Sequence, residues 1–213
     1  KLYFRGITEE VVDYLKEQYG DRFEYVAERD IFDYVYDGEI LRTLKGRKNS
    51  KKRNHINYFL SEYEGRFEYR LLGKADFDDC RQLLDDWTVN KEENNNIEEG
   101  VDDERLGIEK LFAHYDEVCD RLKIAGIYID GKLEAFTMGE LLNNNMALIH
   151  IEKANPEIRG LYPYINQQFL VNEFSDVEFV NREEDLGIEG LRKAKLSYHP
   201  CKFVEKYTVR EAN

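Results

Sequence analysis

The sequence lacks the features that mark a membrane-spanning or secreted protein. No apolar run approaches the roughly 20 residues that a membrane-spanning helix needs, and no signal peptide opens the chain, which starts at Lys1. Cysteine is scarce: Cys80, Cys119 and Cys201 are an odd number, lie far apart and lack the spacing of a zinc site. This pattern argues against a disulfide framework and a metal centre. We therefore expect a cytoplasmic protein without a metal, and the missing methionine predicts that N-terminal residues precede this sequence.

Acidic residues outnumber basic ones, and a single segment departs from this balance. The formal net charge of −13 argues against general nucleic-acid binding. Residues 40–61, however, hold seven bases and no acid, namely Arg42, Lys45, Arg47, Lys48, Lys51, Lys52 and Arg53. A basic island in an acidic chain predicts a docking site for an anionic partner. We expect one helix from Ile40 to Tyr63, with a weak point at Gly46 and with Lys48, Lys52 and Arg53 exposed.

Hydrophobic periodicity predicts an α/β fold with a mixed sheet covered by helices. Before residue 66 it indicates a helix after Thr8, strands at 23–26 and 31–36, and the basic helix. After residue 66, we expect strands at 67–72, 123–129, 132–141, 146–152, 177–181 and 202–208. We expect helices at 76–89, 108–122, 160 onward and 188–197. The acidic, Asn-rich residues 92–104 read as a loop. The resulting order, β-α-α-β-β-β-α-β-α-β, is that of acyltransferases of the GNAT type.

In such a sheet the third central strand and the following helix build the donor site. GNAT enzymes that use coenzyme A hold its pyrophosphate in an Arg/Gln-x-x-Gly-x-Gly/Ala turn at a helix N-terminus. This sequence keeps Arg159 and Gly160 but has Leu161, Tyr162 and Pro163 where further glycines would lie. Bulky side chains there hinder close approach of the backbone, so we expect weak binding of coenzyme A.

Glu152 is the candidate general base. It ends a strand of otherwise apolar residues beside the helix start, where a desolvated carboxylate can accept a proton from an attacking amine. The structural alternative is an ion pair of Glu152 with Lys153 or Arg159. His150 is expected to be a packed or hydrogen-bonded histidine.

The densest polar motif runs from Val180 to Pro200, across a strand end and into a helix. α/β sheets place their ligands at such strand ends. The alternative reading gives Glu183, Glu184 and Asp185 the role of first-turn acids of the helix. We expect Arg182 and Asp185 to serve a site and Glu184 to cap the helix. The polar candidates in this motif are Asn181, Arg182, Glu183, Glu184, Asp185, Arg192, Lys193 and Lys195.

Three motifs together resemble a known family. They are Lys45-Gly46-Arg47-Lys48 with Lys52-Arg53-Asn54-His55-Ile56-Asn57, then His150-Ile151-Glu152-Lys153-Ala154, then Asn181 to Lys195. They resemble the soluble bacterial family named for the C-terminal domain of phosphatidylglycerol lysyltransferase, which is similar to Fem-type transferases with two GNAT-like domains in tandem. The resemblance implies that residues 1–65 end a first GNAT-like domain and that residues 66–213 form a complete second one.

The same resemblance implies aminoacyl-tRNA as the co-substrate in place of coenzyme A. The chain would then transfer an aminoacyl group to an amine or hydroxyl acceptor, with a small-molecule or peptide amine as acceptor and tRNA phosphates on the basic segment. Glu152 or Asp185 would handle the proton, and Arg182, Lys193 or Lys195 would steady the oxyanion or the tRNA end. The alternatives are an N-acyltransferase using acetyl-coenzyme A, with Arg159 and Gly160 on the pyrophosphate, and a non-catalytic RNA- or protein-binding module.

Overall fold

The computed structural model describes residues 1–93 and 101–212 and has a mixed α/β fold. The described chain divides into two compact units, one made of Lys1–Asp37 with the chain from Asn181 onward, the other of Gly38–Val180. The predicted boundary between residues 65 and 66 concerns two repeats of a fold, not these compact units, and it stays a prediction.

The larger unit is built on a sheet with the strand order β4-β5-β6-β7-β8. Its strands are β4 (Phe67–Leu71), β5 (Lys123–Ile129), β6 (Lys132–Asn143), β7 (Met146–Ala154) and β8 (Phe179–Asn181). The first four pair antiparallel in sequence order. Asp130 and Gly131 both take positive φ, 50° and 86°, and form the tight turn predicted between β5 and β6.

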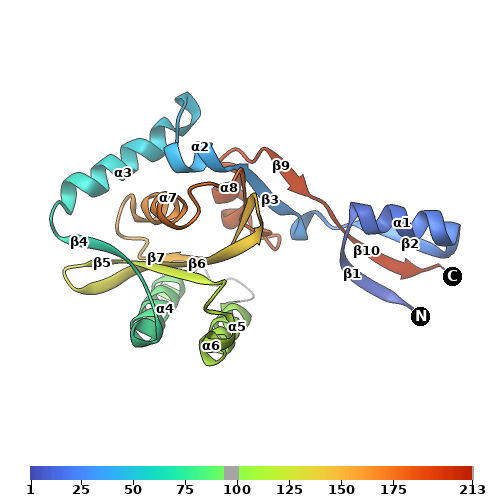
Figure 1. Cartoon of the computed structure of the whole chain (residues 1–213), viewed down its shortest axis with the longest axis horizontal. Helices are drawn as coiled ribbons and strands as arrows, with labels where there is room; N and C mark the ends of the chain where they lie inside the picture. Colours follow the sequence, from blue (N-terminus) through green and yellow to red (C-terminus); the bar gives the residue numbers. More distant parts are fainter. Residues whose placement is uncertain (94–100, 213) are drawn as a thin grey trace. The chain divides into compact units, whose positions relative to one another are not determined.

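Helices cover both faces of this sheet, as Figure 1 shows. On one face lie α4 (Phe77–Glu93), α5 (Val101–Ala113) and α6 (Tyr115–Val118), and on the other lie α7 (Leu161–Glu173), α2 (Gly38–Thr43) and α3 (Ser50–Glu62). A buried cluster that includes Phe77, Leu84, Phe112, Phe136 and Met138 fills the space between α4, α5 and the sheet. Burial of this apolar area is the main favourable term that holds the helices on the sheet.

The smaller unit contains two antiparallel strand groups and two helices. Its strands are β1 (Tyr3–Thr8), β2 (Phe23–Ala27), β3 (Asp33–Asp37), β9 (Lys202–Val204) and β10 (Lys206–Glu211), and its helices are α1 (Glu9–Tyr19) and α8 (Glu189–Leu196). One sheet has the order β1-β10-β2, and β3 pairs with β9. Val12 of α1 packs with Phe23 and Val209 to give this sheet a small core of its own.

The structure corrects several predicted elements. The predicted final strand 202–208 is two strands, β9 and β10, which pair with different neighbours, and β1 was not predicted. Of the predicted loop 92–104, residues 94–100 lie outside the described residues and residues 101–104 belong to α5. The predicted helix 108–122 is interrupted at His114, which precedes the short helix α6.

The predicted continuous basic helix from Ile40 to Tyr63 is wrong. α2 ends at Thr43, a 3₁₀ turn spans Arg47–Asn49, and α3 starts at Ser50. Leu44 and Gly46 have φ values of 48° and 92°, which a right-handed helix cannot accommodate. The glycine singled out as a weak point therefore lies in a full break between two helices.

Candidate active site

The last residues of β7 lie against the first turns of α7. The Glu152 carboxylate accepts a hydrogen bond from Asn166 Nδ2 at 2.8 Å. The phenol oxygen of Tyr162 accepts one from Trp87 Nε1 on α4 at 2.9 Å. Tyr162 and Asn166 are four residues apart on a helix, so they share a face of α7. The Asn166 contact therefore joins α7 to β7, and the Tyr162 contact joins α7 to α4.

The phenol of Tyr162 holds its proton at neutral pH. Burial raises the pKa of Tyr162 to about 12, against the hydrogen bonds from Trp87 and Ala154, and the nearby carboxylates of Glu152 and Glu104 add to the rise. The phenol is therefore protonated, in a partly buried place.

Lys153 and Arg159, the two cations predicted as alternative partners of Glu152, each contact further groups. Lys153 is buried, and its ammonium lies 2.6 Å from the Glu104 carboxylate and 3.7 Å from the centre of the Trp87 ring. Arg159 is exposed and lies over the ring of Tyr58 at 4.8 Å. His150 Nε2 lies 3.2 Å from Glu140, which makes it the hydrogen-bonded histidine that was predicted.

Backbone amides of the turn before α7 donate hydrogen bonds to acceptors within the same turn. Glu157 N donates to Asn155 Oδ1 at 3.0 Å, Ile158 N donates to Asn155 O at 3.2 Å, and Leu161 N donates to Ile158 O at 3.2 Å. A phosphate bound at a helix start takes up such N–H groups, and here three of them are already bonded within the turn.

Gly160 allows α3 to pack directly on this turn. Its φ is 91°, and a Cβ at this position would lie 2.1 Å from the carbonyl oxygen of His55 on α3. Leu161 is fully buried. Gly160 therefore serves close packing between α3 and α7, which is a different use from the cradling of a ligand.

Asp185 lies at the centre of a buried ionic network in the smaller unit. Its side chain is 0% exposed. One carboxylate oxygen accepts hydrogen bonds from Arg29 at 3.3 Å, Arg192 at 2.8 Å and the hydroxyl of Tyr34, and the other accepts from Arg192 at 2.7 Å and Gly187 N at 2.9 Å. Burial alone would raise the pKa of this carboxyl, but the hydrogen bonds from Arg192, Tyr34 and Gly187 outweigh it and lower the pKa to about 2. Asp185 is thus a carboxylate with several donors around it.

Other members of the motif hold the backbone of the same loop. Asn181 donates to Asp33 at 3.0 Å and accepts from Glu183 N at 2.7 Å. The ammonium of Lys195 is buried and donates to the carbonyls of Arg182 and, at 3.3 Å, Glu183. These bonds stabilise Glu183 at a φ of 56°, a conformation that costs energy in a non-glycine residue.

The charged side chains that remain have varied surroundings. Arg182 lies over the rings of Tyr198 at 4.7 Å and Tyr36 at 5.7 Å. Lys193 is exposed and pairs with Glu189 at 2.5 Å. Glu184 lies 3.5 Å from Lys206, and α8 starts only at Glu189. The predicted role of Glu184 as a helix cap, and the alternative reading of residues 183–185 as first-turn acids, are therefore wrong.

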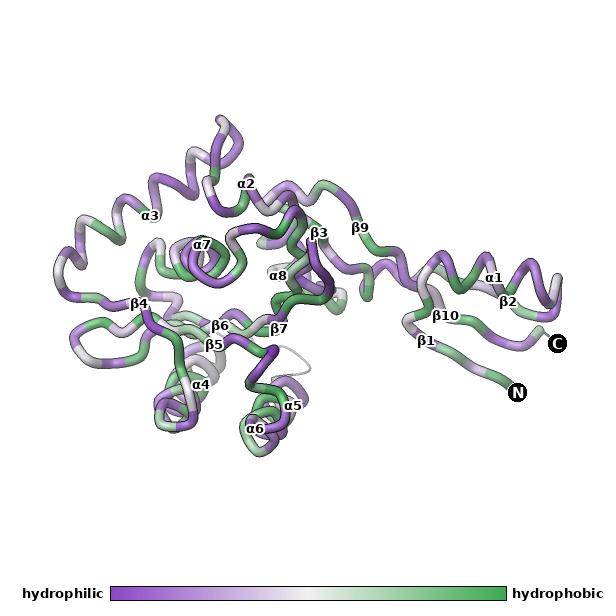
Figure 2. Tube along the Cα trace, viewed as in Figure 1, coloured by the Kyte–Doolittle hydropathy of each residue, from purple (hydrophilic) through white to green (hydrophobic). Residues whose placement is uncertain are grey.

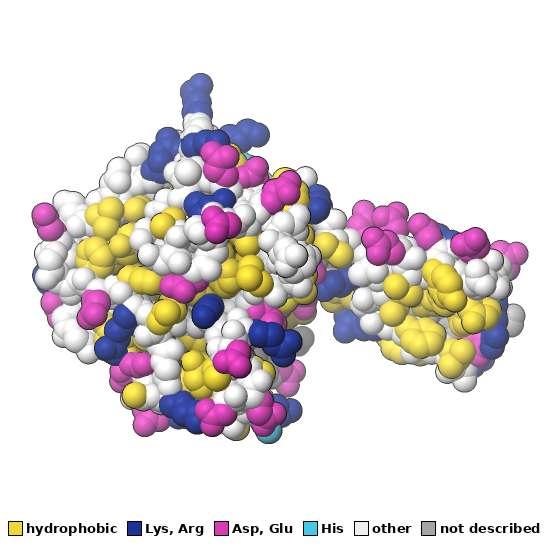
Figure 3. Space-filling view, in the orientation of Figure 1, with side chains coloured by type: hydrophobic (Ala, Val, Ile, Leu, Met, Phe, Trp, Pro, Cys, Tyr) yellow, Lys and Arg dark blue, Asp and Glu magenta, His cyan; other side chains and the backbone are white. Residues whose placement is uncertain are grey.

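The basic segment presents some of its predicted cations to solvent. Lys45, Arg47, Lys48 and Lys51 are exposed, as are Asn54 and Asn57, whereas Lys52 and Arg53 are half-buried. Arg53 donates to the carbonyls of Leu44 and, at 2.8 Å, Gly46, so it closes the break between α2 and α3. In Figure 2 the tube over this connection is mainly hydrophilic, and in Figure 3 Lys and Arg side chains gather over it. The prediction that Lys52 and Arg53 are exposed is wrong, and the one for Lys48 is confirmed.

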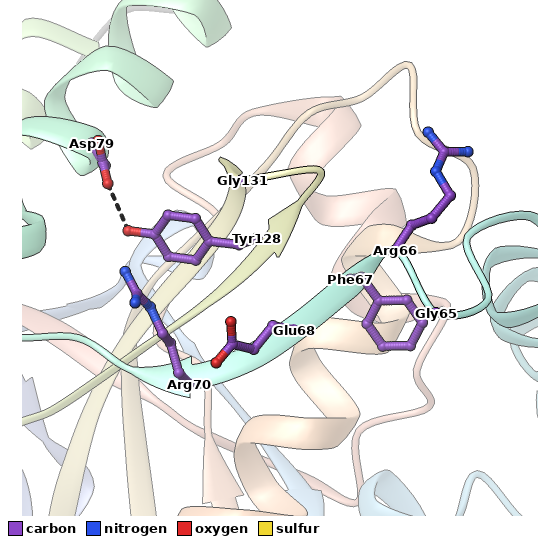
Figure 4. Close-up of a pocket in the computed structure, with 8 residues that line it drawn as sticks. All are labelled: Gly65, Arg66, Phe67, Glu68, Arg70, Asp79, Tyr128 and Gly131. Carbon is purple, nitrogen blue, oxygen red and sulfur yellow. Dashed lines mark hydrogen bonds between the residues drawn. The ribbon is translucent and has the colours of Figure 1, made fainter.

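A separate cavity of about 510 Å³ lies at β4 and β5 and contains no predicted site residue (Figure 4). Arg70 pairs with Asp76 at 2.6 Å and stacks on the Tyr128 ring at 4.1 Å, and Tyr128 donates to Asp79 at 2.7 Å. Its charged groups largely satisfy one another, so the candidate active site remains the end of β7.

Sequence reasoning missed Asn166, Trp87 and Tyr34. Asn166 follows Tyr162 by four residues, which is the only local signal that the two share a helix face. Trp87 contacts Tyr162, which is 75 residues later in the sequence, and Tyr34 contacts Asp185, which is 151 residues later. No sequence spacing points to such pairs.

Apart from the interruption before α6 and the division of the last strand into β9 and β10, the element order from β4 onward is the one predicted for GNAT-type acyltransferases. This class of fold supports a transferase. The chain belongs to the family described as phosphatidylglycerol lysyltransferase, C-terminal, whose model matches residues 1–210. The predicted family resemblance is thereby confirmed.

Similar proteins cover the whole chain. A conserved protein of unknown function from Bacteroides thetaiotaomicron is 35% identical with a TM-score of 0.89, over 99% of this chain and 69% of that one. The C-terminal domain of a putative lysylphosphatidylglycerol synthetase from Agrobacterium fabrum shares the fold at 16% identity and a TM-score of 0.66, over 99% and 68%. An uncharacterized protein from Mycoplasmoides gallisepticum is 24% identical over 98% of this chain, which spans 65% of that relative's length. Among the described residues, no helix has the length and apolar character to cross a membrane.

Proposed function

We propose that this chain transfers an aminoacyl group from aminoacyl-tRNA to an amine or hydroxyl acceptor. The observation that carries the proposal is the turn before α7. Its amides at Glu157, Ile158 and Leu161 are bonded internally, and α3 packs on Gly160. A coenzyme A pyrophosphate would need those amides, whereas an RNA donor can be held by cations elsewhere. The family description, which names a lysyltransferase, supports transfer of an aminoacyl group.

Glu152 is the proposed base of the reaction. Its carboxylate ends β7 and is oriented by the Asn166 amide, and a base must be within hydrogen-bond reach of the proton that it accepts. The acceptor amine or hydroxyl attacks the ester carbonyl and passes its proton to Glu152. Asp185 has a structural role in this proposal, because its carboxylate is fully buried and accepts hydrogen bonds from Arg29, Tyr34 and Arg192.

The exposed bases between α2 and α3 are the proposed contact for tRNA phosphates. Lys45, Arg47, Lys48 and Lys51 are exposed within one short stretch of a chain whose net charge is −13. Phosphate contacts with Lys and Arg supply most of the affinity for nucleic acid and make it salt-dependent.

Transfer itself is tested with the full-length protein. It is incubated with tRNA charged with radiolabelled amino acids and with a pool of small amines and peptides. Label that leaves tRNA for an acceptor faster than spontaneous hydrolysis supports the proposal. Salt-dependent tRNA binding without release of label would contradict it and favour a binding module.

Coenzyme A is expected to bind weakly. The exposed guanidinium of Arg159 favours an acetyl-coenzyme A donor, but three amides of the turn are bonded internally, so the turn offers the pyrophosphate few contacts besides this charge. We expect a dissociation constant above roughly 100 μM, a binding free energy weaker than about −5.5 kcal/mol, measured by calorimetry with acetyl-coenzyme A. A low-micromolar constant would favour a coenzyme-A-dependent N-acyltransferase.

Changing Arg47, Lys48 and Lys51 together to Gln is expected to weaken tRNA binding and its salt dependence. Each lost phosphate contact lowers the slope of log K against log salt by about 0.7 to 0.9, so the slope should fall by about 2 to 3. Filter binding across a salt series measures it. A matched triple variant of Lys16, Lys74 and Lys110, which are exposed on other elements, controls for net charge. Equal effects of the two triples would remove this segment from the tRNA site.

A further inference from the structure

The strand β4 forms a free edge of the sheet in the larger unit. In the described part of the chain it pairs with β5 alone. Asp130 N donates to Arg66 O at 2.9 Å and Leu72 N donates to Ile124 O at 2.8 Å. Hydrogen-bonding positions alternate along an antiparallel pair, so even-numbered residues direct their N–H and C=O groups at β5. The groups that point away from the sheet belong to the odd-numbered residues, namely Phe67, Tyr69 and Leu71.

This edge lacks two of the usual obstacles to a further strand. Natural proteins commonly block an edge with a proline or a bulge. β4 contains no proline, and it pairs with β5 without a shift in register. Glu68, Arg70 and Leu71 are exposed. An edge of this kind can bind an extended peptide as an additional strand, through main-chain hydrogen bonds.

The cavity of about 510 Å³ lies at the same edge (Figure 4). Arg66, Glu68 and Arg70 are spaced two residues apart, so they share one face of the strand, and all three line the cavity. Tyr128, which pairs with Glu68 on β5, and Asp79 of α4 line it as well. The volume is within the range of ligand pockets, so a long side chain from a strand added to β4 has room there.

The charges around the cavity favour a cation. Arg66 Nε lies 3.1 Å from Asp130, and Arg70 pairs with Asp76 at 2.6 Å, so each guanidinium already has a carboxylate. Glu68 makes no hydrogen bond or salt bridge with any residue of the described ranges 1–93 and 101–212. Two bases therefore face four acids, which are Glu68, Asp76, Asp79 and Asp130.

We propose that the free edge of β4 binds an extended peptide segment of another protein, with a Lys or Arg side chain in the cavity beside Glu68. An antiparallel strand, the more stable arrangement, would hydrogen-bond with Phe67 and Tyr69. The Cβ atom of its residue opposite Glu68 would lie about 4.5 to 5.5 Å from that of Glu68, so a cationic head group could reach the carboxylate. Its two flanking residues would lie beside the half-buried rings of Phe67 and Tyr69, which favour apolar side chains.

The test measures the binding of two fluorescently labelled peptides by anisotropy. One is acetyl-Thr-Val-Lys-Val-Thr-amide, and the other has glutamate in place of the lysine. The lysine peptide is expected to bind with a dissociation constant in the high micromolar range. The glutamate peptide should bind about tenfold more weakly, because opposite charges across a strand pair stabilise it and like charges destabilise it.

Glu68→Lys should reverse this preference and keep the melting temperature of wild type, since Glu68 is exposed and has no salt bridge to a described residue. Glu10→Lys is the matched control, because Glu10 is exposed on α1 in the smaller unit and the change in net charge is the same. It should leave the preference for the lysine peptide as in wild type.

N-methylated peptides test the added strand itself. The two valines lie opposite Phe67 and Tyr69, so methylation of their amides should abolish binding. Methylation of the lysine amide, which points away from β4, should weaken binding by less than about threefold. Equal affinity for the lysine and glutamate peptides, binding that survives methylation of the valines, or no binding at millimolar peptide would each overturn the proposal.

Sedimentation velocity tests the other possible occupant, a second copy of this chain. Wild type and Glu68→Lys are expected to sediment alike. A wild-type dimer that Glu68→Lys converts to a monomer would assign the edge to a second copy and overturn the peptide site. No tRNA enters these measurements, so their outcome is independent of the proposed transfer.

Discussion

Glu152→Gln is expected to lower the single-turnover rate of transfer by about 10² to 10⁴-fold and to leave the melting temperature close to that of wild type. Gln has the same shape, and its side-chain oxygen can still accept the hydrogen bond from Asn166 Nδ2. What it loses is the ability to take a proton, and general base catalysis contributes an effect of that size. The rate is measured with labelled aminoacyl-tRNA and the acceptor identified in the transfer assay.

Glu140→Gln is the matched control. Glu140 lies on the neighbouring strand β6 and pairs with His150, so the variant removes a carboxylate from the same sheet. It should leave the rate within a few-fold of wild type. An unchanged rate in Glu152→Gln would assign the proton transfer to another group. A large loss of stability would instead make Glu152 a structural residue, the alternative that its sequence context left open.

Asp185→Ala is expected to destabilise the folded protein by about 2 to 3 kcal/mol. Leaving a buried charge without its partner costs about 3 to 5 kcal/mol, and the cost here is smaller because the side chains of Arg29 and Arg192 are 38% and 32% exposed. Here Arg29, Arg192 and Tyr34 lose their shared acceptor. Urea unfolding at pH 7 measures the change.

The same carboxylate makes stability depend on pH in the acid range. The pKa of Asp185 is lowered to about 2 in the folded protein, against about 3.9 in an unfolded chain. Its contribution is therefore fully present above pH 4 and is lost as the pH falls toward 2, by about 2.5 kcal/mol in all. The difference in stability between wild type and Asp185→Asn should narrow across that window.

Asp130→Asn is the control for this experiment, because Asp130 pairs with Arg66 at an exposed site. Exposed ion pairs contribute little to stability, so this variant should unfold like wild type. An Asp185→Asn protein of normal stability that no longer transfers the aminoacyl group would contradict the structural role of Asp185. It would favour the sequence-based hypothesis that Asp185 and Arg182 act directly on the substrate.

Local sequence patterns predicted the family and, apart from the interruption at His114 and the division of the last strand, the order of elements from Phe67 onward. The hairpin at Asp130-Gly131 and the start of α7 after Gly160 were predicted from two or three residues each. These features depend on local physics, since hydrophobic period and turn chemistry act over a few residues. The break at Gly46 was recognised as a weak point for the same reason. Glu152 was predicted as a candidate base from its place at the end of an apolar strand, beside the start of the next helix.

The contacts of the polar residues depend on the three-dimensional fold. Arg53 was a predicted phosphate contact, and its guanidinium instead closes the loop at Leu44 and Gly46. Asp185 was a predicted proton carrier, and its environment comes from Arg29 and Tyr34, more than 150 residues earlier in the chain. Tyr162 was considered only as an obstacle to coenzyme A, whereas its hydroxyl accepts a hydrogen bond from Trp87, 75 residues earlier in the chain. A charge or a hydroxyl can pair with any complementary group that the fold brings within about 3 Å, and no local pattern in the sequence specifies which group that is.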